Sequence, residues 1–130
     1  MKAINTIGKR KCALAKATLV PGKGIVKINS QLLQNYKPEI ARERINEALI
    51  IAGEDATKVD IKVNVKGGGW QGQNEATRLA IARAFVKYNK KLREKFIKYD
   101  RHLLVADIRV KEQYKPNDSK ARKARQKSYR

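Results

Sequence analysis

Residues 59–85, VDIKVNVKGGGWQGQNEATRLAIARAF, combine the strongest structural patterns of this sequence. The first eight of these residues alternate between valine or isoleucine and polar side chains, which predicts a half-buried strand over 59–66. Three glycines follow. Apolar residues then recur at helical spacing through Ile81, Phe85 and Tyr88, which predicts a helix over about 73–88. A strand, a glycine-rich turn and a helix therefore form the centre of the chain.

The glycine segment GGGWQG (67–72) matches the glycine spacing of two nucleotide-binding motifs. The dinucleotide motif needs an acid about 20 residues on, at the end of a second parallel strand, but here Glu94 lies in a helical stretch. The P-loop needs Lys and Ser or Thr where this chain has Gln73 and Asn74. We therefore predict that the loop binds no mononucleotide, that the chain needs no cofactor, and that it is not an enzyme.

The charge of the chain points to a different ligand. It has 31 Lys and Arg against 12 Asp and Glu, a formal net charge of +19, so it needs a polyanionic partner such as nucleic acid or an anionic membrane. No apolar run is long enough to span a membrane, and the N-terminus lacks the apolar stretch of a signal peptide. One cysteine suits a reducing compartment, so we expect a cytoplasmic protein. Because a helix N-terminus attracts anions, an RNA phosphate is the expected ligand of the glycine loop.

The flanking sequence predicts further elements. The runs 11–20 and 25–29, joined by PGKG (21–24), predict a hairpin. Pro38 and Gly53 bracket a helix, 91–99 predicts a short one, and 103–110 predicts a last strand. The first helix carries an acidic stripe, which we expect to face away from RNA and to meet solvent or a basic protein. It consists of Glu39, Glu43 and Glu47.

The C-terminal sequence has almost no apolar residues to bury. We therefore divide the chain into a globular RNA-binding domain over 1–110 and an extended basic tail over 111–130 that is disordered when free. In the tail, cations are interleaved with small residues, and Tyr129 offers a ring for stacking on single-stranded RNA.

Three single residues invite a chemical role, and each has a simpler explanation. Cys12 lies among small strand residues and is expected to be buried. Trp70 is expected to pack rather than to stack. His102 has no second histidine or nearby cysteine, so we predict no metal site and no catalytic residues.

Three segments together resemble a known family, the ninth ribosomal protein of the small subunit. They are GKRKCALAKATLVPGKGIVKIN (8–29), GGGWQGQNEATRLAIARA (67–84) and QKSYR (126–130). The resemblance covers nearly the whole chain, and the QKSYR ending is similar to the archaeal and eukaryotic branch.

The resemblance implies an α+β fold. It would be a four-stranded sheet with helices packed on it, like the second domain of the fifth small-subunit ribosomal protein, with a left-handed βαβ crossover and an extended basic C-terminal tail. It also implies a structural protein of the small-subunit head that binds rRNA of the 3′ major domain beside neighbouring head proteins. No homo-oligomer is expected. The tail would extend towards the anticodon loop of peptidyl-site tRNA, although the segment DSKA (118–121) departs from the family pattern.

Charge, the glycine loop and the resemblance together give a set of expected contact residues. The expected RNA-binding residues are Lys9, Arg10, Lys11, Lys16, Gly67, Gly68, Gly69, Gly72, Gln73, Arg78, Arg83, Lys120, Arg122, Lys123, Arg125 and Lys127. The expected tRNA-contacting residues are Ser128, Tyr129 and Arg130. The alternative function is a free-standing basic nucleic-acid-binding protein or chaperone, which composition alone does not exclude.

Overall fold

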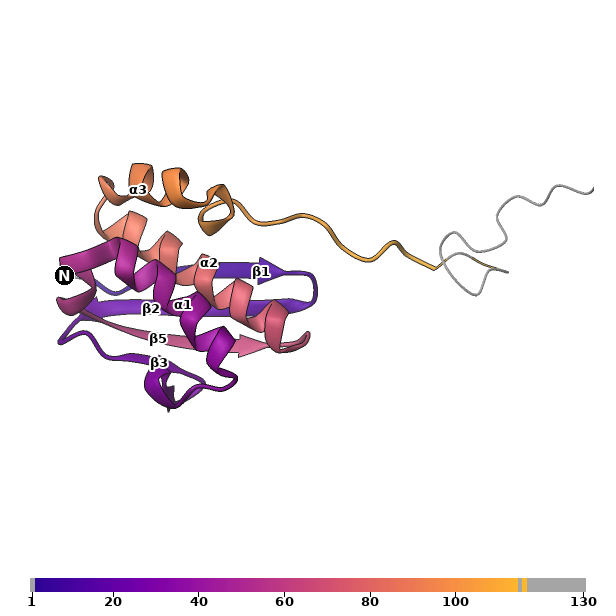
Figure 1. Cartoon of the computed structure of the whole chain (residues 1–130), viewed down its shortest axis with the longest axis horizontal. Helices are drawn as coiled ribbons and strands as arrows, with labels where there is room; N and C mark the ends of the chain where they lie inside the picture. Colours follow the sequence, from indigo (N-terminus) through magenta and orange to yellow (C-terminus); the bar gives the residue numbers. More distant parts are fainter. Residues whose placement is uncertain (1, 115, 117–130) are drawn as a thin grey trace, which may run out of the picture.

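A five-stranded mixed sheet, in the order β1-β2-β5-β3-β4, forms one layer of the molecule. In this computed structural model, which describes residues 2–114 and 116, the strands are β1 (Ile4–Arg10), β2 (Ala13–Pro21), β3 (Val26–Ile28), β4 (Gln31–Leu32) and β5 (Val59–Lys66). Three helices form the second layer: α1 (Glu39–Ala52), α2 (Trp70–Tyr88) and α3 (Leu92–Tyr99). Short 3-10 turns lie at Leu33–Asn35, Gly53–Thr57 and Arg101–Leu103 (Figure 1).

Elements with strong periodicity form where the sequence predicts them. Strand β5 has the predicted bounds, because its alternation matches one buried and one open face. Helix α1 begins after Pro38 and ends at Gly53, whose φ of 62° lies in the left-handed region. Helix α2 starts at Trp70, three residues before the predicted position, with Gly69 as its N-cap.

The number of strands differs from the expected four. Residues 4–10 and 31–32 form strands that the sequence pattern does not predict, whereas the predicted strand over 103–110 is absent. Instead, the chain leaves the 3-10 turn Arg101–Leu103 and continues without regular secondary structure. Leu103 alone of this segment is fully buried, so the apolar residues there anchor the turn rather than extend the sheet.

The predicted hairpin between 11–20 and 25–29 is wrong. Strand β2 pairs antiparallel with β1 on one side and β5 on the other, and β3 pairs parallel with β5. Asp60 at the start of β5 helps to hold this path of the chain, because its Oδ1 accepts hydrogen bonds from the backbone N–H groups of Lys23, Gly24 and Ile25 at 2.8, 3.1 and 3.0 Å. These bonds carry the PGKG turn past β5, so that β3 lies on the far side of that strand.

Small residues let helix α2 lie very close to the sheet. A side chain at Gly8 of β1 would collide with the backbone of Ala76 and Ala80 in α2. Beside this contact, the Thr6 hydroxyl donates a hydrogen bond of 2.7 Å to the carbonyl oxygen of Ala80. Most of α2 from Asn74 to Phe85 is buried as a result, between the sheet and the other helices. This leaves the opposite face of the sheet uncovered.

Candidate nucleic-acid interface

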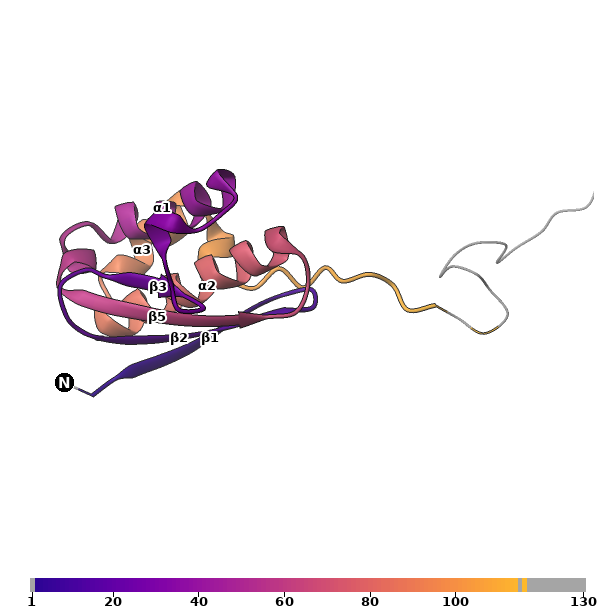
Figure 2. The ribbon, with the colours of Figure 1, turned by 90° about the horizontal axis from the view of Figure 1, so that it is seen from below.

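The uncovered face of the sheet is lined with lysines. All three helices lie on the other face (Figure 2). The register brings the outward residues of neighbouring strands into rows, in which Lys9 and Lys66 both flank Leu14, and Lys27 and Lys62 are direct neighbours. The exposed lysines of this face, which we call the open lysine face, are Lys9, Lys16, Lys27, Lys62 and Lys66. Adjacent strands are about 4.8 Å apart, so these ammonium groups form a continuous positive surface suited to a phosphate backbone.

The sequence predicts only part of this face. Lys9 and Lys16 are among the expected RNA-binding residues, whereas Lys27, Lys62 and Lys66 are not. The alternation over 59–66 does place Lys62 and Lys66 on one side of their strand, so a local signal for these two exists. Their convergence with Lys16 depends on the strand order, which the predicted hairpin has wrong.

The β1–β2 turn packs against the glycine loop. Lys11, in the turn, is exposed and has a φ of 52°. Gly67 and Gly68 have φ values of 80° and 66°, and a Cβ on Gly67 would collide with the carbonyl oxygen of Cys12. These two glycines therefore allow the turn and the loop to meet, which is a structural reason for them independent of any ligand.

The other glycines of the loop are less closely packed. A Cβ on Gly69 would meet no atom within 4 Å, and one on Gly72 would touch Ala13 at 3.6 Å. The amide nitrogen of the Gln73 side chain donates to the carbonyl oxygen of Gly67 at 3.1 Å, which closes the loop over the start of α2. The Gln73 side chain thus stabilises the conformation of the loop.

A groove of about 600 Å³ opens at the N-terminus of α2. It is lined by the glycine loop, the β1–β2 turn and the chain around Lys111. Trp70 is 44% exposed there and Cys12 is exposed, so the expectations that they would pack and be buried are wrong. The first backbone N–H groups of a helix have no acceptor within it, so this end of α2 favours an anion, and the indole offers a face for stacking.

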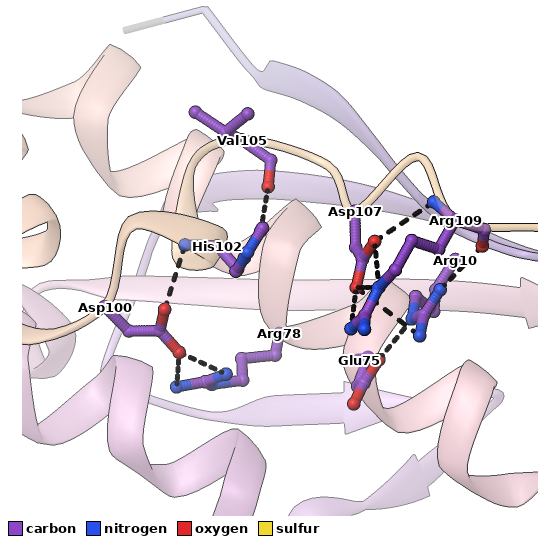
Figure 3. A network of polar contacts seen from close by, with 8 residues as sticks. All are labelled: Arg10, Glu75, Arg78, Asp100, His102, Val105, Asp107 and Arg109. Atoms are coloured by element: carbon purple, nitrogen blue, oxygen red, sulfur yellow. Dashed lines mark hydrogen bonds and ion pairs between the residues drawn. The ribbon is translucent and has the colours of Figure 1, made fainter.

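Three arginines among the expected RNA-binding residues bond to other groups of the protein. The Arg78 side chain is only 8% exposed and its Nη2 donates to Glu47 at 2.8 Å. The same nitrogen lies 3.4 Å from Asp100, a contact drawn in Figure 3. Arg83 donates to the carbonyl oxygens of Leu104 and Ile7 at 3.2 and 2.8 Å. Ile7 belongs to β1, an edge strand, so Arg83 occupies a carbonyl that another strand would otherwise pair with.

Arg10 is the third, and it fixes the start of the C-terminal extension. Its Nε donates to Glu75 at 2.7 Å, its Nη1 to the carbonyl oxygen of Arg109 at 2.9 Å, and its Nη2 lies 3.4 Å from Asp107 (Figure 3). Side-chain and backbone hydrogen bonds from Arg109, with Arg10 nearby, hold the pKa of Asp107 far below its usual range. The chain then leaves at the end of the molecule that carries the β1–β2 turn and the glycine loop (Figure 1).

The rest of the expected contact set lies outside the described residues. It comprises Lys120, Arg122, Lys123, Arg125, Lys127, Ser128, Tyr129 and Arg130. Within residues 2–114 and 116, no three His, Cys, Asp or Glu side chains are grouped so that they could hold a metal ion. None of the described helices is both long and apolar enough to cross a membrane.

Comparison with known proteins gives one consistent result. The family model for ribosomal protein S9/S16 matches residues 8–130. The small ribosomal subunit protein uS9 of Methanococcus maripaludis strain C7 is 43% identical over 134 residues, with all of both chains covered. The corresponding proteins of strains S2 and C5 give the same identity and coverage. The chain therefore belongs to the ribosomal protein S9/S16 family, the uS9 proteins of the small ribosomal subunit.

Proposed function

We propose that this chain is a structural protein of the small-subunit head that binds rRNA of the 3′ major domain through the open lysine face. The observation that carries the proposal is the gathering of five lysines on the sheet face that none of the described helices covers. The β1–β2 turn and the groove at the N-terminus of α2 extend this surface with Lys11 and Lys111. Arg10, Arg78 and Arg83 are left out of the proposed contact set, because their guanidinium groups are bound internally.

The family membership also bears on the alternative functions. The family consists of ribosomal structural proteins, so the chain is not an enzyme. It also favours a ribosomal protein over a free-standing chaperone, since the similarity covers the full length of the relatives.

The salt dependence of rRNA binding tests the role of the open lysine face. Lys16, Lys62 and Lys66 are changed together to Gln, and the matched control changes Lys90, Lys95 and Lys98, three exposed lysines in and next to α3, to Gln. Removing one phosphate contact should reduce the slope of log K against log salt by about 0.7–0.9. The sheet variant should therefore have a slope smaller by up to about 2–3, and the control should change much less. Equal slopes for both variants would contradict the assignment of this face.

We further propose that the tail extends to peptidyl-site tRNA, with Ser128, Tyr129 and Arg130 at its contact. The support is the family resemblance of the QKSYR ending and the exit of the chain beside the proposed RNA surface. A terminal guanidinium can grip a phosphate with two hydrogen bonds, a contact of about 1–3 kcal/mol. Deleting Arg130 should speed tRNA dissociation from purified subunits without blocking assembly. With Arg130→Lys, the dissociation rate should lie between the rates of the deletion and of the unchanged protein. Unchanged dissociation in the deletion would remove the tRNA contact.

The left-handed crossover of the family is also proposed for β3–α1–β5. Strands β3 and β5 are parallel neighbours, and α1 connects them. In Figure 1 the helices lie towards the viewer, β5 runs to the right and lies above β3, and this arrangement supports the left hand. An experimental structure with the opposite hand would overturn it.

A further inference from the structure

The outer side of α1 carries a stripe of residues that RNA binding does not explain. Ile40, Glu43, Glu47 and Ile50 follow one another at intervals of three, four and three residues, so they line up along one side of the helix. This α1 stripe is about 15 Å long, at 1.5 Å per residue. Its two isoleucines are 66% and 76% exposed, so they present apolar surface at both ends of the row.

The α1 stripe faces away from the proposed RNA surface. The buried side of α1 carries Ala41, Ile45 and Ala48, which pack into the core. The stripe lies on roughly the opposite side of the helix, by the 100° turn per residue. Figure 2 shows α1 above the sheet and the uncovered sheet face below, so the two surfaces lie on opposite sides of the molecule.

The charge of the stripe argues against rRNA as its partner. Glu43 is exposed in the middle of the row, and its carboxylate would repel a phosphate backbone. Glu47 also has an internal role, because its Oε2 accepts the 2.8 Å hydrogen bond from Arg78. In a chain with a net charge of +19, six of the twelve acids lie between 39 and 60, so this is the acidic region of the protein.

An apolar groove lies beside α1 as well. It has a volume of about 410 Å³ and its lining includes Ile25, Leu32 and Leu49. Ile25 and Leu32 are 45% and 40% exposed. Asn46, which also lines the groove, is one helical turn before Ile50. Apolar side chains of a partner can thus cover Ile40 and Ile50 and also enter this groove.

We propose that the α1 stripe docks a basic, partly apolar segment of another protein of the small subunit. Lys or Arg side chains of the segment would meet Glu43, while its apolar side chains cover Ile40 and Ile50 and enter the groove. Charge complementarity selects this partner, since a surface of opposite charge steers association and fixes the register of the contact. The inference rests on the proposed function, because the partner is encountered in the assembled subunit.

Site-specific cross-linking in assembled small subunits tests both proposals separately. A photoreactive benzoylphenylalanine replaces Ile50 in one variant and Lys62, on the open lysine face, in another. After irradiation, position 50 should cross-link to a protein peptide with a net positive charge, and position 62 to rRNA. A position-50 cross-link to rRNA or to a second copy of this chain, or none in particles that contain the variant, overturns the docking proposal. Failure of position 62 to reach rRNA would count against the proposed function instead.

A charge reversal tests the electrostatic part of the docking. With the photoreactive residue at position 40, Glu43→Lys should lower the yield of the protein cross-link on the order of fivefold or more, the scale expected for an anchoring interface residue. The matched control is Glu94→Lys, an exposed acid on α3, which should leave the yield unchanged. Glu47 is kept in both variants because it bonds to Arg78. Equal yields in the two variants would overturn the proposed basic partner.

Discussion

At the scale of single residues, part of the positive charge of this chain serves the fold rather than a ligand. Arg78 joins α2 to Glu47 of α1 and to Asp100, the residue that follows α3. Because its side chain is 8% exposed, removing the guanidinium leaves carboxylates without their charged partner. Composition cannot distinguish such an arginine from one that contacts RNA, since both add one positive charge.

Arg78→Lys separates these two roles. An ammonium group keeps the charge but lacks the planar fork that reaches both carboxylates, so the free energy of unfolding should fall by about 1–3 kcal/mol in urea denaturation. The affinity of the folded variant for rRNA should not change. A loss of affinity like that of the Lys16, Lys62 and Lys66 variant, without loss of stability, would return Arg78 to the interface.

Gly8→Ala tests the close approach of α2 to β1. The added methyl group would collide with the backbone of Ala76 and Ala80, so the helix must shift outward. Overpacking of this kind costs about 1–3 kcal/mol, measurable as a lower urea midpoint. Gly69→Ala is the matched control, because nothing lies within 4 Å of the added atom and its φ of −91° suits any residue. Equal midpoints for the two variants would show that α2 is not held against Gly8.

At the scale of elements, the sequence predicts what periodicity encodes and misses what distant contacts decide. The alternation of 59–66 and the bracketed helix after Pro38 both predict correct bounds, because each pattern matches a half-buried element. Strand β1 escapes prediction because its polar residues and Gly8 make no strong pattern alone, and its pairing with β2 supplies the order. The strand order is accompanied by contacts such as that of Asp60 with a turn 35 to 37 residues away, and no local signal carries such a contact.

Asp60→Ala should loosen the PGKG turn and weaken the acid sensitivity of folding. Backbone hydrogen bonds from Ile25 and Lys23 lower the pKa of Asp60. A carboxylate with a lowered pKa stabilises the fold above its unfolded value of about 3.9, and this contribution disappears as the pH falls towards the lowered value. The variant should therefore have lower stability at pH 7 and a smaller further decrease on acidification, measured by urea denaturation from about pH 7 to 3.

The control for this turn is Glu54→Ala, an exposed acid in the 3-10 turn Gly53–Thr57. Hydrogen exchange at Lys23, Gly24 and Ile25 should quicken in Asp60→Ala alone. Unchanged exchange at these three amides would mean that the turn is held by other contacts, such as the 3.0 Å bond from the Gly22 N–H to the carbonyl oxygen of Lys58.

At the scale of the whole molecule, the fold sets the open lysine face and the acids of α1 on opposite sides (Figure 2). The helix layer carries lysines too, in and next to α3. The sequence predicts only the acidic stripe of the first helix, and not the positive surface that the sheet lysines form. Its placement in space depends on the fold, which brings Lys16 of β2 beside Lys62 and Lys66 of β5 on one surface.

The folded part should determine the stability of the protein, whereas the tail should contribute to RNA binding. Residues 117–130 contain six Lys and Arg and one Asp, a net charge of +5, whereas the buried core ends at Leu103. Deleting 117–130 should therefore leave the thermal unfolding midpoint nearly unchanged. It should also reduce the slope of log K against log salt for rRNA binding by about 0.7–0.9 for each phosphate that the tail neutralises.

A matched variant keeps the full length and replaces Lys120, Arg122, Lys123, Arg125, Lys127 and Arg130 with Gln, which separates charge from chain length. The deletion and the uncharged tail should show the same reduction in slope, because counterion release depends on the number of phosphates neutralised. If the variant with the uncharged tail has the same slope of log K against log salt as the unchanged protein, the tail acts through its length. A lowered midpoint in the deletion would show that the tail stabilises the fold, and the boundary near residue 110 would then have to move towards the C-terminus.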